Sequence, residues 1–267
     1  MFDLSSKRSR NAHIVYAPVA LVIATLPHRQ VNGTEFVRRN GRHTLSILAP
    51  SRVGLPYGVI PRLLVIWITT QVKTTGQREI KLGDSCRAFL KELGIQSTGG
   101  KNGSIGRLRK QLRSLLQCTI SISEHSENVD QESGMRLADQ SALWWSGDHL
   151  QESFIFLSSA FFYDITKSAF PVDVRAIREL RQSPLALDIY LWITYRVYRL
   201  TKPCVISWVD LQNQFGTDYA KQWHFEKAFT KHLQSVKRVY PELIAHCSAK
   251  QGLYLHPSKT HVLGGCG

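Results

Sequence analysis

Two basic stretches of this sequence contain the residue types that bind nucleic acids. Lysine and arginine neutralise phosphates or hydrogen-bond guanine edges, glutamine pairs with adenine, and hydroxyl groups contact either bases or phosphates. In the first stretch the candidates are Lys101, Ser104, Arg107, Lys110, Gln111, Arg113 and Ser114. In the second stretch they are Lys221, Gln222, His224, Lys227, Thr230, Lys231, Gln234, Lys237 and Arg238. We expect these side chains to contact double-stranded DNA.

Helical spacing separates these polar side chains from an apolar face in both stretches. In the first stretch the apolar face comprises Ile105, Leu108, Leu112, Leu115 and Leu116. In the second stretch it comprises Phe225, Ala228, Phe229, His232 and Val236. We therefore predict two amphipathic helices whose basic faces point outward, with His232 at the edge of the core. Such a helix fits the DNA major groove and reads bases mostly through its N-terminal part.

The elements that must position these helices occur twice along the chain. Residues 64–69 resemble 188–194, residues 80–84 resemble 206–210, and residues 108–115 resemble 229–236. Three matches in the same order indicate two copies of one unit. A single basic helix face is more often merely solvated, but two at matched positions in a repeated unit favour DNA binding.

Each copy predicts the same succession of elements. A helix over 61–73 or 184–199 precedes a short strand over 79–82 or 205–208. A second helix follows, capped by Asp84-Ser85 or by Asp210 and ended by Gly94 or Gly216. The basic helix comes next, and then a strand over 118–123 in the first copy or a hairpin over 243–255 in the second. This is the order of a winged helix-turn-helix, so we predict an α+β fold of two tandem winged-helix domains related by internal duplication.

This pattern divides the chain into three segments. We expect a basic N-terminal arm over 1–44, a first winged-helix domain over 45–168 and a second over 169–263. The first domain carries an acidic insertion, 124–152, and the chain returns as a strand over 153–157. The basic residues of the first segment either bind a DNA groove or form a solubilising tail; they are Lys7, Arg8, Arg10, Arg29, Arg38, Arg39 and Arg42. Trp144 and Trp145, in the acidic insertion, fit either a buried strand pair or an exposed contact.

The charge balance points to a polyanionic partner. The 267 residues contain 34 Lys and Arg against 20 Asp and Glu, a net charge of +14. Residues 124–152 hold seven of the acids and one of the bases, so the rest of the chain carries a net +20. Nucleic acid is the first candidate for such a chain and a membrane surface is the second.

Catalytic and metal-binding patterns are not matched. Residues 94–101 imitate a phosphate-binding loop, but Gly100 stands where that motif needs lysine. The ten histidines contain no His-x-His pair of the kind that nicking nucleases use, and HExxH and Gly-x-Ser-x-Gly do not occur. The five cysteines are scattered, which favours reduced thiols over a zinc site. We therefore expect no catalytic residues, no cofactor and no bound metal.

Targeting and membrane signals are weak. The longest apolar run, Leu63–Thr70, is far shorter than the roughly 20 residues of a membrane span. The basic residues 7–10 followed by 14–26 imitate a signal peptide, but Pro18 interrupts the apolar run. We expect a cytoplasmic protein.

Several motifs in order resemble the RepA-type plasmid replication initiators. The resemblance covers about residues 45–263 and is weaker in the first 40 residues and in the acidic insertion. Its motifs are residues 55–62, 81–85, 92–94, 98–100, 111–113, 183–192, 214–216 and 240–241. The resemblance implies a bacterial, plasmid-encoded protein that is not an enzyme and that binds the direct repeats (iterons) of a plasmid origin. It further implies opening of the nearby duplex and recruitment of the host initiator and the replicative helicase.

Two other functions remain open. The first is a dimeric winged-helix transcription regulator, or a repressor of its own gene, which would share the fold and the DNA chemistry. The resemblance also implies that dimers of the protein do not bind iterons. A nicking enzyme is the second alternative. Neither the DNA sequence of the site nor the dimer surface follows from the residues.

Overall fold

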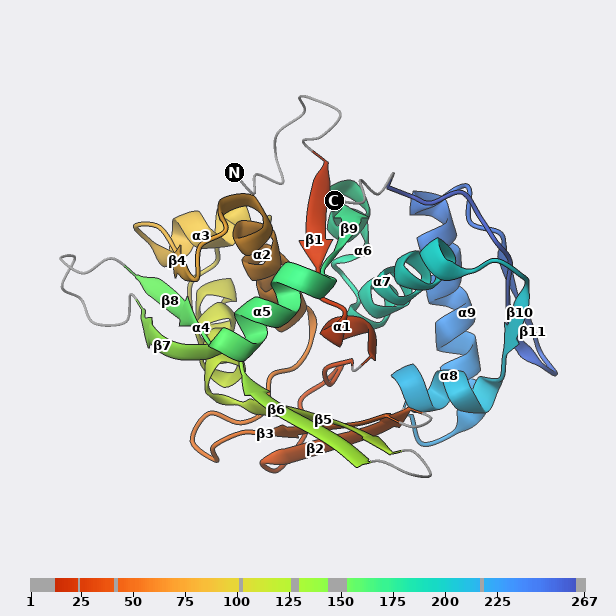
Figure 1. Cartoon of the computed structure of the whole chain (residues 1–267), viewed down its shortest axis with the longest axis horizontal. Helices are drawn as coiled ribbons and strands as arrows, with labels where there is room; N and C mark the ends of the chain where they lie inside the picture. The colour runs from red at the N-terminus through yellow and green to blue at the C-terminus, as the bar shows by residue number, and fades with distance from the viewer. Residues whose placement is uncertain are drawn as a thin grey trace.

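Helices and short strands alternate along the chain in the computed structural model, which describes residues 13–23, 25–40, 43–100, 103–125, 130–143, 153–216 and 219–262. One continuous cluster of buried apolar residues runs through both halves of the chain. In Figure 1 the first half lies on the left, the second half on the right, and a four-stranded sheet lies beneath them. The predicted mixture of helices and strands is confirmed.

The second half contains the predicted succession of elements. They are α7 (Pro184–Arg199), β10 (Cys204–Ile206), α8 (Trp208–Phe215), α9 (Gln222–Val239), β11 (Ala245–Ser248) and β12 (Gly252–Leu255). The three strands form one antiparallel sheet in the order β10-β12-β11. The strand after the first helix therefore pairs with the last strand of the hairpin.

The first half repeats this arrangement with an extension. Its elements are α2 (Val59–Thr75), β4 (Glu79–Lys81), α3 (Cys86–Glu92), α4 (Ser104–Gln117), β7 (Ala138–Ala142) and β8 (Phe154–Leu157). Here too the strand after the first helix pairs with the last strand, in the sheet order β4-β8-β7. The predicted return strand over 153–157 is confirmed as β8.

The strand predicted over 118–123 is present directly after α4, but it does not belong to that three-stranded sheet. It is β5 (Thr119–His125), and it pairs with β6 (Asp130–Arg136) and with β3 (His43–Leu48). Leu45 and Ile47 of β3 lie opposite Ile122 and Ile120 of β5. These apolar cross-strand pairs favour the pairing of β5 with β3. The start of the acidic insertion thus extends a second sheet, of order β2-β3-β5-β6.

The described part of residues 1–44 is folded into the body, so the expected separate arm is wrong for residues 13–44. Strand β1 (Ile14–Ala17) pairs with β9 (Phe170–Asp173), and α1 (Ala20–Ile23) packs on α7. Strand β2 (Glu35–Asn40) forms a hairpin with β3, so the expected boundary at residue 44 cuts this hairpin. The remaining helices are α5 (Ser159–Ser168) and α6 (Val174–Leu180).

The second helix of each unit is capped by a serine. Ser85 accepts a hydrogen bond from the Ala88 N–H at the start of α3, and Ser207 accepts one from the Asp210 N–H at the start of α8. The predicted cap Asp210 therefore lies inside the helix, where its carboxylate accepts a hydrogen bond from the Ser207 hydroxyl at 2.6 Å. Gly94 follows α3 with a positive φ and Gly216 caps α8, as predicted.

A buried ion pair joins the two halves. The Arg62 guanidinium of α2 donates two hydrogen bonds of 2.7 Å to the Asp188 carboxylate of α7, and both side chains are fully buried. The same guanidinium donates to the carbonyls of Leu26 and Gly58, and His28 hydrogen-bonds Asp188 at 2.8 Å. Because all of these groups are paired, the cluster fixes α2, α7 and the segment after α1 relative to one another.

A second contact fixes the four-stranded sheet to the second half. Arg38 of β2 is buried, and its guanidinium donates to the Thr25 hydroxyl at 2.5 Å and to the Gln214 carbonyl of α8 at 2.7 Å. The Gln214 amide in turn donates to the carbonyl of Val22 in α1. The sheet and α8 therefore move as one body.

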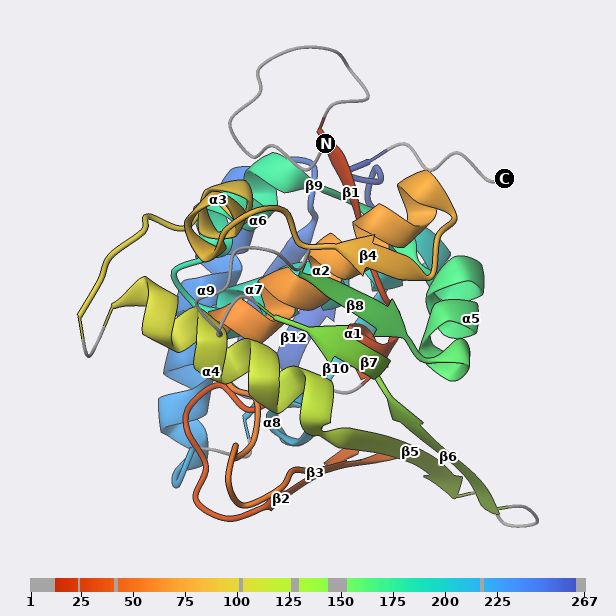
Figure 2. The ribbon, with the colours of Figure 1, turned by 90° about the vertical axis from the view of Figure 1, so that its left-hand side faces the viewer.

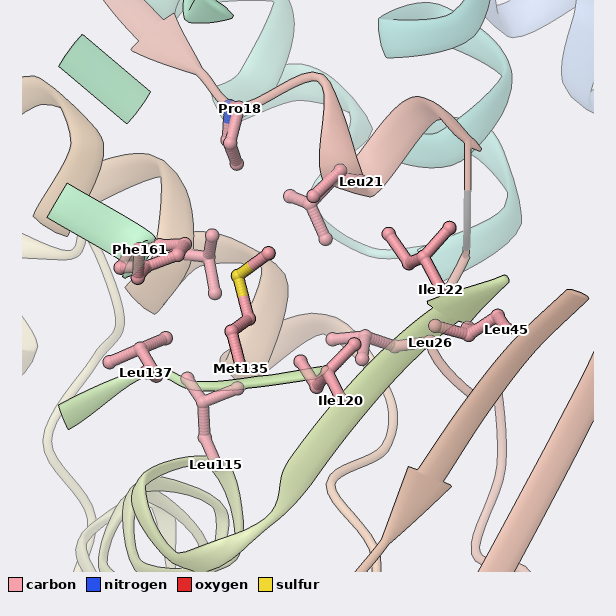
Figure 3. A pocket seen from close by; sticks show the side chains of 12 residues that line it. Pro18, Leu21, Leu26, Leu45, Leu115, Ile120, Ile122, Met135, Leu137 and Phe161 are labelled. Carbon is pink, nitrogen blue, oxygen red and sulfur yellow. The ribbon is translucent and has the colours of Figure 1, made fainter. Parts of the chain in front are cut away.

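Between this sheet and the helices lies a small apolar cavity of about 40 Å³. Figure 3 shows its side chains pointing toward one another from α1, α2, α4, α5 and the sheet. They are Pro18, Ala20, Leu21, Leu26, Leu45, Val65, Leu115, Ile120, Ile122, Met135, Leu137 and Phe161.

Candidate nucleic-acid interface

Helix α4 presents its basic side chains to solvent. Leu108, Leu112 and Leu115 are fully buried, whereas Arg107, Lys110 and Arg113 are exposed. The Lys110 ammonium lies 5.5 Å from the centre of the Tyr57 ring, so an aromatic face supports the cation. The predicted outward face of α4 is confirmed for these three cations.

Three predicted contact residues of α4 are buried, so the expectation that they face outward is wrong. The Ser104 hydroxyl accepts from the Thr98 N–H and donates to the Gln96 carbonyl, which ties the helix to the preceding loop. Gln111 accepts from the Tyr57 N–H at 2.8 Å, and Ser114 donates to the Val53 carbonyl at 2.9 Å. These two lie on the flank of α4 that residues 49–58 cover, and that cover does not show in the helical spacing. Lys101 lies outside the described residues.

Helix α9 follows the sequence prediction closely. Phe225, Phe229 and Val236 are fully buried, as is Leu233, and they pack against α7, α6 and α8. The exposed side chains are Lys221, Gln222, His224, Lys227, Lys231, Gln234 and Arg238. The indole of Trp223 is also exposed and lies against the His224 ring, with ring centres 3.6 Å apart and the planes tilted by 50°. Helix α9 thus carries a long polar and basic outer face.

Two predicted contact residues near this face are half-buried. Thr230 lies at its margin, and the Lys237 ammonium donates to the Ala245 carbonyl of β11 at 3.0 Å. Lys237 therefore ties α9 to the hairpin instead of pointing freely outward. His232 is at the core edge, as predicted, and hydrogen-bonds Ser183 at 3.3 Å. Burial, together with the charge of Lys231, lowers the pKa of His232 below its ordinary value.

The two basic helices lie on the same side of the molecule. Figure 2 shows α4 and α9 on the left-hand side, with α5 on the opposite side. A groove of about 640 Å³ runs from Arg107 and Lys110 of α4 to Arg181 and Gln182 in the turn after α6. Gln182 also lines a second cleft, which continues to Arg238 of α9. The two clefts share Gln182 and together extend from α4 to α9.

The basic residues of the first segment divide into three groups. Arg38 is buried and structural, which corrects its expected role in an arm. Arg29 and Arg39 are exposed. Lys7, Arg8, Arg10 and Arg42 lie outside the described residues, and so do Trp144 and Trp145. No arm or tryptophan contact is therefore assigned to these positions.

Sequence reasoning missed the residues that support the interface from elsewhere in the chain. Tyr57 supports both Gln111 and Lys110, and Arg52 donates to the Gln117 side chain at 3.2 Å. Arg181 donates to the Gly94 carbonyl and so joins the turn after α6 to the end of α3. The unusual run Leu55-Pro-Tyr-Gly58 signals a structured turn, but spacing alone does not show which helix it covers.

Among the residues that the structure describes, no cluster of three or more His, Cys, Asp or Glu side chains is arranged to hold a metal ion. Within the same residues, no helix combines the length and the apolar character needed to cross a membrane.

A comparison with protein families shows to which family this chain belongs. The model of the family described as plasmid-encoded RepA protein matches residues 55–210, which is more than half of the chain. The chain belongs to the plasmid-encoded RepA family. The matched residues of this RepA-family protein run from the turn before α2 into α8, so they include α4 but end before α9.

Solved structures share the fold of this RepA-family protein. A crystal structure of selenomethionine derivatives of domains 2 and 3 of RctB aligns with a TM-score of 0.59 at 12% identity, covering 92% of this chain and 97% of that chain. Another crystal structure of RctB domains 2–3 gives a TM-score of 0.52 at 10% identity, covering 88% and 94%. At such low identity the likeness describes the fold alone. A comparison with curated proteins gives no match.

Membership in the RepA family supports a role in the initiation of plasmid replication. Membership in this family also suggests DNA binding at an origin. Helix α4 lies within the matched residues, and α9, which exposes similar basic and polar residue types, lies beyond them.

Proposed function

We propose that this RepA-family protein binds duplex DNA at the direct repeats of a plasmid origin. Helices α4 and α9 act as the recognition helices of two tandem winged-helix domains that arose by duplication. Support comes from the sheets: in both halves a strand, two helices and a closing hairpin follow the first helix, and the sheets connect in the same order. Hairpins β7–β8 and β11–β12 are then the wings.

One observation carries this proposal. Two helices in equivalent positions lie on the same side of the molecule (Figure 2), and both expose cations: Arg107, Lys110 and Arg113 on α4, and Lys227 and Lys231 on α9. The face of α9 combines cations for phosphates with polar groups for base edges, whereas the exposed arginines and lysine of α4 can bind phosphates or guanine edges. Two such helices in one chain suit two successive major grooves, about 34 Å apart along the duplex.

The initiator acts by binding rather than by catalysis. Bound at the repeats, the protein promotes opening of the nearby duplex and brings in the host initiator and the replicative helicase, in the cytoplasm of a bacterial cell. A nicking activity is tested directly by incubating the protein with supercoiled plasmid and magnesium. Relaxed plasmid at stoichiometric protein would contradict a purely binding role.

The geometry of the DNA site separates an initiator from a regulator. We expect a DNase I footprint on the DNA flanking this gene to show protected direct repeats, each occupied by one protein molecule. Protection of an inverted repeat by a dimer would instead assign the protein to the transcription regulators. The affinity should fall by about 10³ to 10⁵ between 50 and 200 mM salt if ~6–10 phosphates are contacted. A flat salt response would contradict DNA binding through these helices.

Helix α9 can be tested by removing its outward lysines. The double variant Lys227→Ala, Lys231→Ala should lose most DNA affinity because two phosphate contacts disappear, and the salt slope should fall by about 0.9 for each contact. Both side chains are exposed, so the melting temperature should stay unchanged.

A matched control removes the same charge from the opposite side. Lys167 and Arg199 are exposed and line a cleft at the end of α5. The variant Lys167→Ala, Arg199→Ala should therefore keep its salt slope and most of its affinity. Equal losses in the two double variants would show that net charge matters and that α9 has no special role.

A further inference from the structure

The groove between α4 and the turn after α6 is a built feature of the fold. We name it the central groove. Its volume is about 640 Å³, and its walls come from the segment after α1, the start of α2, the end of α3, the start of α4 and the α6–α7 turn. The lining residues are 28–30, 57–60, 63, 94–96, 107, 110, 111, 181, 182 and 184.

The central groove is strongly cationic. Arg29, Arg107, Lys110 and Arg181 line it, and among its described lining residues none is acidic. The nearest carboxylate on α7, Asp188, is buried beneath the groove and is already neutralised by Arg62. Four positive charges in one concave surface therefore act together on an approaching anion.

Local contacts hold these cations in place. The Arg29 guanidinium lies 5.6 Å from the centre of the Tyr219 ring, and Lys110 lies over Tyr57. Arg181 donates to the Gly94 carbonyl. Their positions are set before any ligand binds, so little side-chain entropy is lost on binding.

Uncharged polar groups lie between the cations. Gln30, Gln96 and Gln182 line the same groove, and the Tyr57 hydroxyl donates to the Gln30 side chain at 3.2 Å. Amides beside cations suit a chain of phosphates and sugars better than a single small anion.

The groove also connects the two recognition helices. Arg107 and Lys110 belong to α4, and Gln182 is shared with the cleft that reaches His232 and Arg238 of α9. A duplex that places one major groove on α4 and the next on α9 must pass its intervening backbone across this region.

We propose that the central groove binds the phosphate backbone of the DNA segment between the two major-groove contacts. This inference rests on the proposed function and adds Arg29 and Arg181 to the residues that contact DNA. The contacts are to phosphates, so they strengthen binding to every sequence equally and set the register of the two helices on the site.

The first test measures salt dependence. We expect Arg29→Gln, Arg181→Gln to lower the slope of log affinity against log salt by about 0.9 per lost contact, equally for origin and unrelated DNA. The control Lys167→Gln, Arg199→Gln should leave the slope unchanged. Since Arg181 also supports Gly94, Arg29→Gln alone provides a second variant, because the Arg29 guanidinium lies over the Tyr219 ring, and it should show half of the expected change. An unchanged slope in both variants, with intact melting curves, would overturn the inference.

The second test removes charge from the DNA. Neutral methylphosphonates are placed at the phosphates between the two protected major grooves. The wild-type protein should lose affinity for this DNA, whereas Arg29→Gln, Arg181→Gln should lose no more than it has already lost. An equal penalty in both proteins would overturn the inference.

The outcomes also separate this inference from the proposed function. If Lys227→Ala, Lys231→Ala abolishes binding while the groove variants bind normally, only the groove assignment fails. If the wild-type protein shows no preference for origin DNA, the proposed function fails. Binding of free ATP that the groove variants lose without any change in salt slope would make the groove a nucleotide site and overturn its assignment to DNA.

Discussion

The carboxylate of Asp188 contacts both halves of the chain and the segment after α1. It accepts two hydrogen bonds from Arg62 and one from His28. The charge of Arg62 and the hydrogen bonds outweigh the burial of Asp188, so its pKa lies below the ordinary value. Its contribution to stability is therefore present above the ordinary aspartate pKa and is lost as the pH falls through the lower, folded value.

Removing this carboxylate should destabilise the whole molecule. Asp188→Ala leaves the Arg62 guanidinium buried without its counter-ion, which costs about 3–5 kcal/mol. Urea unfolding measures the loss. The double variant Arg62→Met, Asp188→Leu removes both charges and should recover much of the stability. A double variant as unstable as the single one would show that packing, not charge pairing, dominates at this position.

Three histidines that are at least partly buried predict instability in mild acid. Burial lowers the pKa of His28, His232 and His261 below the ordinary value of 6.5. Between the ordinary and the folded pKa values, the unfolded chain binds protons that the folded chain does not, so stability falls as the pH falls below about 6.5. The melting temperature should drop between pH 7.5 and 5.5, and His28→Gln should make the drop shallower. An identical pH profile for that variant would exclude His28 as a contributor.

Sequence patterns predicted the outward residues of α9 better than those of α4. Helical spacing shows which side chains share a face, and α9 is covered only along the face that the apolar stripe marks. In α4 a distant segment covers one flank as well, so Gln111 and Ser114 are buried although their spacing places them beside exposed arginines. Arg181 was missed because it joins the interface only through the fold.

The elements themselves were predictable where the chain pairs locally. The hairpin over 243–255 and the return strand over 153–157 are both present. Strand β5 was predicted, but its partner was not, because Leu45 of β3 lies 77 residues before Ile122, the residue that it faces in β5. Long-range pairing leaves no local sequence signal.

The β11–β12 hairpin depends on Gly252. Its φ is +118°, and an added Cβ would lie 2.0 Å from the Ile206 carbonyl oxygen of β10. Gly252→Ala should therefore distort this sheet and lower the melting temperature, since such strain costs on the order of 1–3 kcal/mol. Gly99→Ala is the matched control because an added Cβ there has no neighbour within 4 Å. Equal melting curves for the two variants would show that the hairpin adapts.

The whole molecule sets the distance between α4 and α9. The Arg62–Asp188 pair, the Arg38 contact with Gln214 and the β1–β9 pairing all join the halves. The two helices therefore hold one spacing, and the proposed function predicts that each repeat presents two major grooves at that spacing.

Changing the spacing of the DNA site tests this rigidity. An insertion of about five base pairs between the two protected grooves turns one groove to the opposite side of the duplex, so affinity should fall to that of unrelated DNA. An insertion of about ten base pairs restores the direction but not the distance and should also fail. The same insertions beside the repeat serve as controls. Tight binding to either lengthened site would mean that the two halves move independently.

The apolar cavity between the four-stranded sheet and the helices predicts how the molecule responds to pressure. Hydrostatic pressure favours states of smaller volume, and unfilled internal space is what unfolding eliminates. The space of about 40 Å³ around Met135 and Phe161 lies where the sheet rests on the helices. Under compression this region should therefore yield first, before the core beneath α9, where Phe225 and Phe229 are fully buried.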